Sequence, residues 1–265
     1  MEVGSVDVGR GTHAWLDAAR ALTDRIAETQ GPAIERASAL CAAAIARDGL
    51  VHLFGTGHSR IPVEEMFPRY GSYPGFHPIV ELSMTFHTQV AGANGQRQAM
   101  FIERVPGLAD VILRNFSFGP DDVMMIFSAS GLSAVPVEMA RAARGRGLPV
   151  IAVTSLAQSA AGEVDPRVGG RLLEEADVVI DLCTPVGDAL CTLEGVDTPV
   201  GPGSTIANIT IVNWVKVRVA ELLAASGDLP PVLTAASVVG EERSTALFEA
   251  AYREHARRAA RVRAT

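Results

Sequence analysis

The sequence predicts an α/β fold, a three-layer α/β/α sandwich in which helices cover both faces of a central parallel sheet. Short, mainly apolar runs at residues 50–54, 123–127 and 176–182 have the composition of strands that are buried on both faces. Helical patterns separate these runs, and this alternation predicts parallel strands. Two glycine- and serine-rich turns directly follow predicted strands, at the sheet edge where such folds bind their ligands.

The amino-terminal part is predicted to be helical. Residues 12–47 carry apolar side chains at helical spacing, and Gly31-Pro32 marks a break or a kink. The apolar faces of residues 14–26 and 34–45 are rich in alanine. Each face either covers the core or contacts a second subunit.

The following elements are predicted from apolar periodicity and from the glycines and prolines between them. In chain order they are a strand at 50–54, a helix at 61–70, a strand at 75–80, a helical stretch at 81–89, a polar patch at 91–98, a helix at 108–116, a strand at 123–127, a helix at 134–144, a strand at 149–154, a loop or short helix at 158–171, a strand at 176–182, an extended loop at 184–203, a helix at 204–225, a proline-rich linker at 228–234 and a helix at 241–263. We expect one domain over residues 12–226 and a helical extension over residues 235–265.

Charge and composition exclude several classes of protein. The chain has 265 residues and a net charge of −7, which argues against binding to nucleic acid or to an anionic membrane. No apolar run approaches the roughly 18–20 residues that cross a bilayer, and the amino terminus lacks the pattern of a secretion signal. Cys41, Cys183 and Cys191 form no CxxC pair. Their odd number favours buried thiols in a reducing cytoplasm, so we expect a cytoplasmic protein.

The turn after the predicted strand at 123–127 is the first candidate site. It holds Ser128, Ser130, Gly131 and Ser133 and leads directly into a helix. Backbone N–H groups, three hydroxyls and the positive end of a helix favour an anion there, and we expect a phosphate monoester. The alternative is that the serines only cap the helix, although one cap needs one hydroxyl. The lysine of a nucleotide-binding phosphate loop is absent, and Ser128 replaces the first glycine of a serine-nucleophile elbow.

The turn after the predicted strand at 50–54 is the second candidate site. Its residues are Gly55, Thr56, Gly57, His58 and Ser59. The two glycines let the backbone approach a ligand closely. The third glycine of a dinucleotide-binding fingerprint is replaced by arginine at position 60, which argues against a nicotinamide or flavin cofactor. We therefore expect no cofactor, and interpret this turn as a second wall of a phosphosugar pocket.

The two turns together resemble the SIS (sugar isomerase) domain family. The matching segments are FGTGHS at 54–59, FSASGLS at 127–133 and the ADVVIDL strand at 176–182, and their order fits over roughly residues 35–225. The sequence looks most like the single-domain, phosphosugar-binding SIS proteins of bacteria. The resemblance implies a flavodoxin-like or Rossmann-like sheet and a homodimer or larger even oligomer.

The same resemblance implies roles for particular residues. Ser128, Ser130 and Ser133 would hold the phosphate of a sugar phosphate. Ser59 and the backbone of 55–57 would contact the sugar or the phosphate. The far side of the pocket would be lined by two further residues, Thr154 and Ser155.

The acid or base of such a reaction is not evident from the family pattern. Isomerases of the family carry Glu or His on the helix after the last strand, and here that helix carries Asn208 and Asn213. A neutral amide cannot transfer a proton as a carboxylate or an imidazole does. The base therefore comes from elsewhere in the chain, or the protein only binds its ligand.

Three residues are the main candidates for this chemistry. His58 lies inside the first turn, and a histidine is the side chain whose unperturbed pKa is close to neutral. Glu81 ends a predicted strand, and Glu64 lies one to two helical turns beyond His58. The alternatives are a helix cap, a solvent-exposed side chain or a glutamate that complements the helix dipole. His87 and Glu103 are secondary candidates, which a subunit interface or the surface would equally explain.

These observations lead to one expected function and two alternatives. We expect a protein that binds a phosphorylated sugar or amino sugar, as an aldose–ketose phosphosugar isomerase. The alternatives are a non-catalytic sugar-phosphate sensor and an etherase or lyase that acts on an amino-sugar phosphate. His77, Glu81 and His87 lack the HExxH spacing of a metal site, so we expect no metal.

Overall fold

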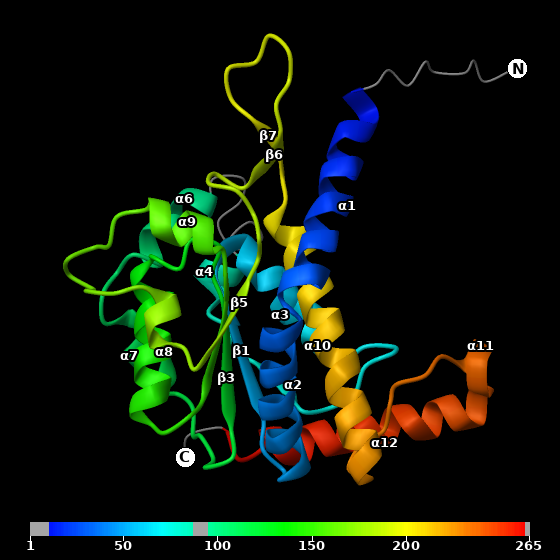
Figure 1. The fold of residues 1–265 in the computed structure, drawn as a ribbon. Coiled ribbons are helices and arrows are strands. Elements are labelled where there is room, and N and C mark those ends of the chain that lie inside the picture. The colour runs from blue at the N-terminus through cyan, green and yellow to red at the C-terminus, as the bar shows by residue number, and fades with distance from the viewer. Residues whose placement is uncertain (1–10, 87–94, 263–265) are drawn as a thin grey trace, which may run out of the picture.

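The central sheet has five parallel strands, and the computed structural model describes residues 11–86 and 95–262 of the chain. The strand order is β2-β1-β3-β4-β5 (Figure 1). The strands are β1 (Val51–Gly55), β2 (Phe76–Pro78), β3 (Val123–Phe127), β4 (Val150–Thr154) and β5 (Val178–Asp181). Helices cover both faces of the sheet, which confirms the predicted three-layer α/β/α fold (Figure 1).

The helices follow the predicted order, with some boundaries shifted. Those of the amino-terminal half are α1 (Gly11–Thr29), α2 (Gly31–Ala46), the 3₁₀ turn η1 (Gly57–Arg60), α3 (Ile61–Met66), α4 (Leu82–Thr85), α6 (Gly95–Ile102) and α7 (Leu108–Leu113). Those of the carboxyl-terminal half are α8 (Ala134–Gly145), α9 (Leu156–Ala161), the 3₁₀ turn η3 (Leu172–Glu175), α10 (Ser204–Ser226), α11 (Ala236–Val239) and α12 (Glu241–Ala259).

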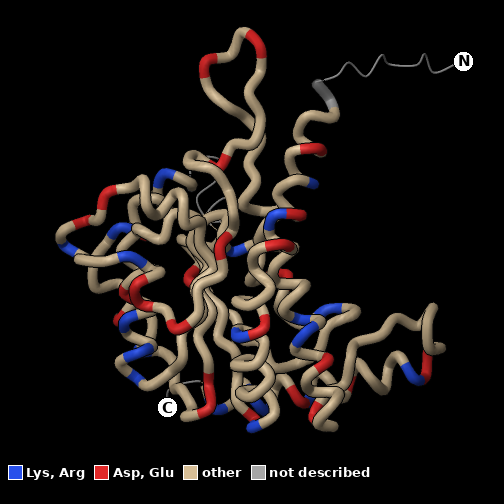
Figure 2. Tube along the Cα trace, viewed as in Figure 1, with Lys and Arg blue, Asp and Glu red and all other residues tan. Residues whose placement is uncertain are grey.

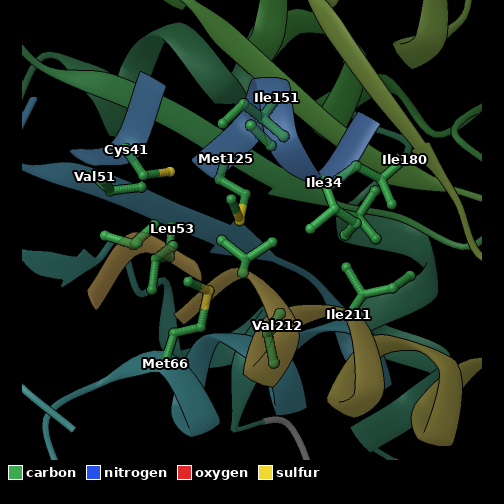
Figure 3. Close-up of a cluster of buried hydrophobic side chains, with 14 of the residues drawn as sticks. Ile34, Cys41, Val51, Leu53, Met66, Met125, Ile151, Ile180, Ile211 and Val212 are labelled. Atoms are coloured by element: carbon green, nitrogen blue, oxygen red, sulfur yellow. The ribbon is translucent and has the colours of Figure 1, made fainter. Parts of the chain in front are cut away.

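The sheet is buried between two apolar clusters, one on each face. Side chains alternate along a strand, so Val51 and Leu53 belong to one cluster and Phe54 to the other. Figure 3 shows the first cluster, in which side chains of α2 and α10 meet those of the strands. The second cluster is formed mainly with α7 and α8. Burial on both faces explains why the strands are apolar along most of their length.

Charged side chains lie almost entirely outside this sheet. Of the Asp, Glu, Lys and Arg residues, the five strands contain only Asp181, and Figure 2 shows the others spread over the outer helices and loops. In the described part of the chain, no helix combines the length and apolar character needed to cross a membrane.

Three segments differ from the prediction. The helix predicted to reach residue 70 ends at Met66, because Phe67 precedes Pro68 and has an extended backbone. Residues 95–98, predicted as part of a polar patch, form the start of α6. The predicted extended loop contains a two-stranded antiparallel hairpin, β6 (Ala189–Cys191) and β7 (Val200–Pro202), which projects beside α1 (Figure 1).

The carboxyl-terminal helix is bound to the amino ends of the strands, opposite the two turns. Arg258 is buried and donates to the carbonyl oxygens of Ile45 and Gly49, each at 2.9 Å. Arg261, two residues beyond α12, donates to Asp122 Oδ1 at 2.6 Å. The guanidinium groups of these two residues are therefore hydrogen-bonded to acceptors within the chain.

Asp122 is the centre of a buried polar cluster at this end of the sheet. It also accepts hydrogen bonds from the N–H groups of Leu50 (2.8 Å) and Gly119 (2.6 Å), and His52 Nε2 lies 3.1 Å from its carboxylate. Burial opposes ionisation of Asp122, but these hydrogen bonds outweigh it and lower its pKa to about 2. His77 Nδ1 lies 3.2 Å from His52 Nδ1, and burial lowers the pKa of His77 to about 4.

Candidate functional site

The serine turn is compact because of a glycine and a local hydrogen bond. Gly131 has φ +64°, a backbone conformation that other residues rarely adopt, and a Cβ at this position would lie 2.9 Å from Thr154 Oγ1. A larger residue would therefore be strained in its backbone and would also clash with Thr154. Its N–H donates to Ser128 Oγ at 3.2 Å. The turn therefore places Ser130 and Ser133 at the rim of a cavity instead of in the core.

Ser133 does not cap the following helix through its side chain. It is the N-cap residue of α8, with an extended backbone, but its hydroxyl donates to Glu103 Oε1 at 3.0 Å. Within the described residues, the backbone N–H groups of Ser130, Leu132, Ser133 and Ala134 donate no hydrogen bond. Together with the positive end of α8, these N–H groups form a donor set for an anion.

The glycine turn lies next to the serine turn because β1 and β3 are neighbours. Gly55 pairs in register with Phe127. A Cβ on Gly55 would lie 2.1 Å from the carbonyl oxygen of Ser59, and Gly57 has φ +55°. The hydroxyl of Thr56, which is buried, donates to Glu103 Oε2 at 2.6 Å.

Glu103 thus connects the two turns with one carboxylate. It follows α6 directly, and each of its oxygens accepts one hydroxyl hydrogen, from Thr56 and from Ser133. In the sequence it was only a secondary candidate, because no motif surrounds it. Only the packing of α6 brings residue 103 to residues 56 and 133.

These residues surround a cavity of about 510 Å³, within the range of small-molecule sites. Its lining comes from the two turns, α6, α9 and the loop after β5. The residues are Thr56, Gly57, His58, Ser59, Gln96, Ala99, Met100, Glu103, Ser128, Ala129, Ser130, Ser133, Gln158 and Gly187. The described lining holds one carboxylate and one imidazole but neither lysine nor arginine. An anion inside this cavity would meet neutral donors and the helix end, whereas Arg104 borders an adjoining hollow that Ser130 and Ser133 also line.

Two of the three predicted catalytic residues lie outside this lining. Glu81 is the N-cap of α4 and accepts from the Ser83 hydroxyl at 2.7 Å and from the Met84 N–H at 2.9 Å. Glu64 forms an ion pair with Arg60 at 3.2 Å and borders a separate, mainly apolar groove of about 230 Å³. His58 is the only one of the three in the cavity lining as described.

Thr154 and Ser155 lie outside the cavity lining and form hydrogen bonds to the backbone of neighbouring segments. The Thr154 hydroxyl donates to the carbonyl oxygen of Ala129 at 3.3 Å. Ser155 caps α9 by accepting from the Gln158 N–H, and its hydroxyl donates to the carbonyl oxygen of Thr184 at 2.8 Å. Both are buried and neither is among the described lining residues.

The side-chain amides of Asn208 and Asn213 form hydrogen bonds within their own helix. Asn208 and Asn213 each donate to a carbonyl oxygen one turn earlier in α10, at 2.8 and 3.0 Å. His87 lies outside the described residues. Among the residues that are described, no group of three His, Cys, Asp or Glu side chains is arranged to hold a metal ion.

The fold and the cavity define a class of protein. A parallel sheet with two adjacent Gly/Ser turns at the carboxyl ends of its strands, one of them at a helix N-terminus, is the arrangement of α/β small-molecule-binding domains. Within that class the chain belongs to the SIS domain family, whose model matches residues 14–155.

Similar proteins are found in several bacteria. A UPF0309 protein of Brucella abortus is 36% identical over 234 residues, which cover 88% of this chain and 91% of the relative. A UPF0309 protein of Listeria monocytogenes is 31% identical over 224 residues, covering 84% and 88% of the two chains. Both matches extend well beyond the segment that the family model covers.

Two solved structures are also similar. A phosphoheptose isomerase from Francisella tularensis has a TM-score of 0.47 and 14% identity, over 80% of this chain and 97% of that one. The sugar isomerase domain of an RpiR transcription factor from Sphaerobacter thermophilus has a TM-score of 0.46 and 17% identity, over 92% and 98% of the two chains.

Proposed function

We propose that this protein binds a phosphorylated sugar in the cavity between the two turns, with the phosphate at the serine turn. The observation that carries the proposal is the donor set at the N-terminus of α8, where the N–H groups of Ser130, Ser133 and Ala134 have no acceptor in the described chain. A phosphate monoester offers mainly acceptor oxygens at neutral pH, and it complements such a set. Membership of the SIS domain family supports the same ligand class.

We further propose that Glu103 is the base of a proton transfer next to the sugar carbonyl. Its carboxylate lies in the cavity and is fixed by Thr56 and Ser133. In an aldose–ketose isomerisation, the base removes a proton from the carbon next to the carbonyl, and an enediol forms. The base then returns a proton to the former carbonyl carbon, so no atom is gained or lost. His58 would move the proton between the two oxygens.

The alternatives use the same cavity. An etherase or lyase would begin with the same removal of a proton, followed by loss of a leaving group from the adjacent carbon. A sensor would bind the sugar phosphate and leave it unchanged. Glu103 favours a catalytic role, because a carboxylate beside a bound dianion weakens binding and is unexpected in a site that only binds.

The test begins with a thermal-shift screen of aldose, ketose and amino-sugar phosphates. Each hit is then incubated in D₂O and examined by NMR for deuterium at C1 and C2 and for new products. We expect exchange by the wild type and a loss of roughly 10²- to 10⁴-fold in Glu103→Gln. Glu81→Gln is the matched control and should keep its activity, since that side chain caps α4. Binding without exchange by the wild type would support the sensor.

We also propose that the chain self-associates, through α1 and the projecting hairpin. The apolar face of α2 is used within the chain, because Ile34, Cys41 and Ile45 are buried in the core, so it cannot serve a second subunit. Much of the apolar face of α1 is also buried, at Leu22 and Ile26. Large apolar side chains remain exposed at Leu16 on α1, and at Leu193 and Val196 between β6 and β7. Figure 1 shows α1 and the hairpin extending beyond the sheet.

A further inference from the structure

Ser133 lies between two groups that require the same hydrogen. Its hydroxyl donates to Glu103 Oε1 at 3.0 Å, and it lines the cavity at the N-terminus of α8, where the phosphate is proposed to bind. A serine hydroxyl has one hydrogen to donate, and a phosphate dianion can only accept. Ser133 therefore cannot donate to the carboxylate and to the phosphate at the same time.

We propose that Ser133 is a positioning residue that couples phosphate binding to the release of Glu103 Oε1. This inference rests on the proposed function. When the phosphate arrives, the hydroxyl hydrogen turns about the Cβ–Oγ bond from the carboxylate to a phosphate oxygen. No covalent bond changes and no proton is transferred in this step, and the rotation needs no backbone movement.

Thr56 keeps the carboxylate in place while Oε1 is released. Its side chain is buried, and its hydroxyl lies 2.6 Å from Oε2, so this hydrogen bond is independent of the serine turn. After the switch, Oε2 remains held and Oε1 has lost a donor. A carboxylate oxygen that loses a hydrogen bond to its charged form becomes a better proton acceptor. The geometry therefore assigns Oε1 as the oxygen that removes the proton from the sugar.

This arrangement would make the phosphate more than an anchor. A sugar without phosphate would meet a carboxylate whose two oxygens are both occupied by hydroxyl donors. A sugar phosphate would meet the same carboxylate with one oxygen released. Selectivity for phosphorylated substrates would then act on the proton-transfer step as well as on binding.

Electrostatic repulsion also weakens phosphate binding next to Glu103, and it must be separated from the effect of the Ser133 hydrogen bond. The phosphate and the Glu103 carboxylate are both anions, and no lysine or arginine is among the described residues that line the cavity. Removing the negative charge of Glu103 will therefore tighten phosphate binding by electrostatics alone. Only the part of the gain that depends on the Ser133 hydroxyl reports the proposed coupling.

A double-mutant cycle separates the two effects, with the binding of inorganic phosphate measured by calorimetry. The four proteins are the wild type, Glu103→Gln, Ser133→Ala and the double variant. Glu103→Gln should tighten phosphate binding on the order of tenfold, the value of one hydrogen bond to a charged group. In the Ser133→Ala background the gain should fall by at least about threefold, because no hydroxyl is left to release.

Two further backgrounds distinguish the switch from a structural role. Ser133→Thr keeps the hydroxyl. In this background, Glu103→Gln should increase the affinity for phosphate as much as it does in the wild-type background. Thr56→Val removes the donor to the other carboxylate oxygen and should leave the gain as large as in the wild-type background. Circular dichroism of each variant verifies that it is folded.

The possible failures are distinct. An equal gain in the wild-type and Ser133→Ala backgrounds would mean that only charge is involved, and would overturn the coupling while the proposed function stands. A wild type that binds neither inorganic phosphate nor any sugar phosphate would overturn both.

Discussion

Replacing Ser130 by aspartate tests the phosphate site directly. Ser130 is half-buried, lines the cavity, and its N–H is one of the donors without an acceptor in the described chain. Ser130→Asp places a carboxylate where the phosphate is proposed to lie. Ligand binding should be lost, since two anions would compete for one set of donors.

The folded state should tolerate this substitution. A carboxylate near a helix N-terminus contributes about 0.3–1 kcal/mol of stability, and repulsion from Glu103 acts in the opposite direction across the cavity. The ligand-free melting temperatures of the variant and the wild type should therefore lie within a few degrees of each other. A large difference would indicate that the turn itself is damaged.

The expected ligand effect is large enough to measure. A ligand at about 100 times its Kd stabilises the native state by about 2.7 kcal/mol. At about 2–4 °C per kcal/mol for a chain near this size, the wild type should gain about 5–10 °C. Ser130→Asp should gain almost nothing with the same sugar phosphate, and Ser130→Asn, which is neutral and of similar size, should keep part of the shift. A full wild-type shift in Ser130→Asp would refute the assignment of the phosphate to this turn.

Three further predictions concern stability and assembly. Asp122→Ala should lower the free energy of unfolding by about 3–5 kcal/mol in urea titrations, because it leaves Arg261, the buried N–H of Leu50 and the half-buried N–H of Gly119 without their acceptor. Asp121→Ala, at the more exposed neighbour, should cost under about 1 kcal/mol. The pKa of His77 is about 4 in the folded state and 6.5, its usual value, in the unfolded state. As the pH falls from 6.5 toward 4, the unfolded state therefore binds a proton that the folded state does not. The free energy of unfolding should fall by up to about 3 kcal/mol over this range. The same pH series on His77→Gln should show a shallower loss, and an unchanged slope would contradict the assignment. Sedimentation at micromolar concentration should show an even oligomer, whereas a single species of 27.9 kDa would argue against self-association.

Local patterns in the sequence were sufficient to predict the fold and both turns. Strands buried on both faces are apolar along their length, as Val123–Phe127 is, and this signature does not depend on distant residues. The turns were predictable for a similar reason. Glycines that permit positive φ or close approach, such as Gly57 and Gly131, and serines before a helix act within a few residues of themselves.

The identity of the proposed acid or base depended on the tertiary structure. Glu81 and Glu64 were favoured because they lie near predicted strand ends and turns, yet one caps α4 and the other pairs with Arg60. Glu103 lies 47 residues from Thr56 and 30 from Ser133 along the chain. No periodicity or spacing relates positions so far apart. Their contact exists because β1 and β3 are adjacent in the sheet and α6 packs over both turns, which is a property of the folded chain alone.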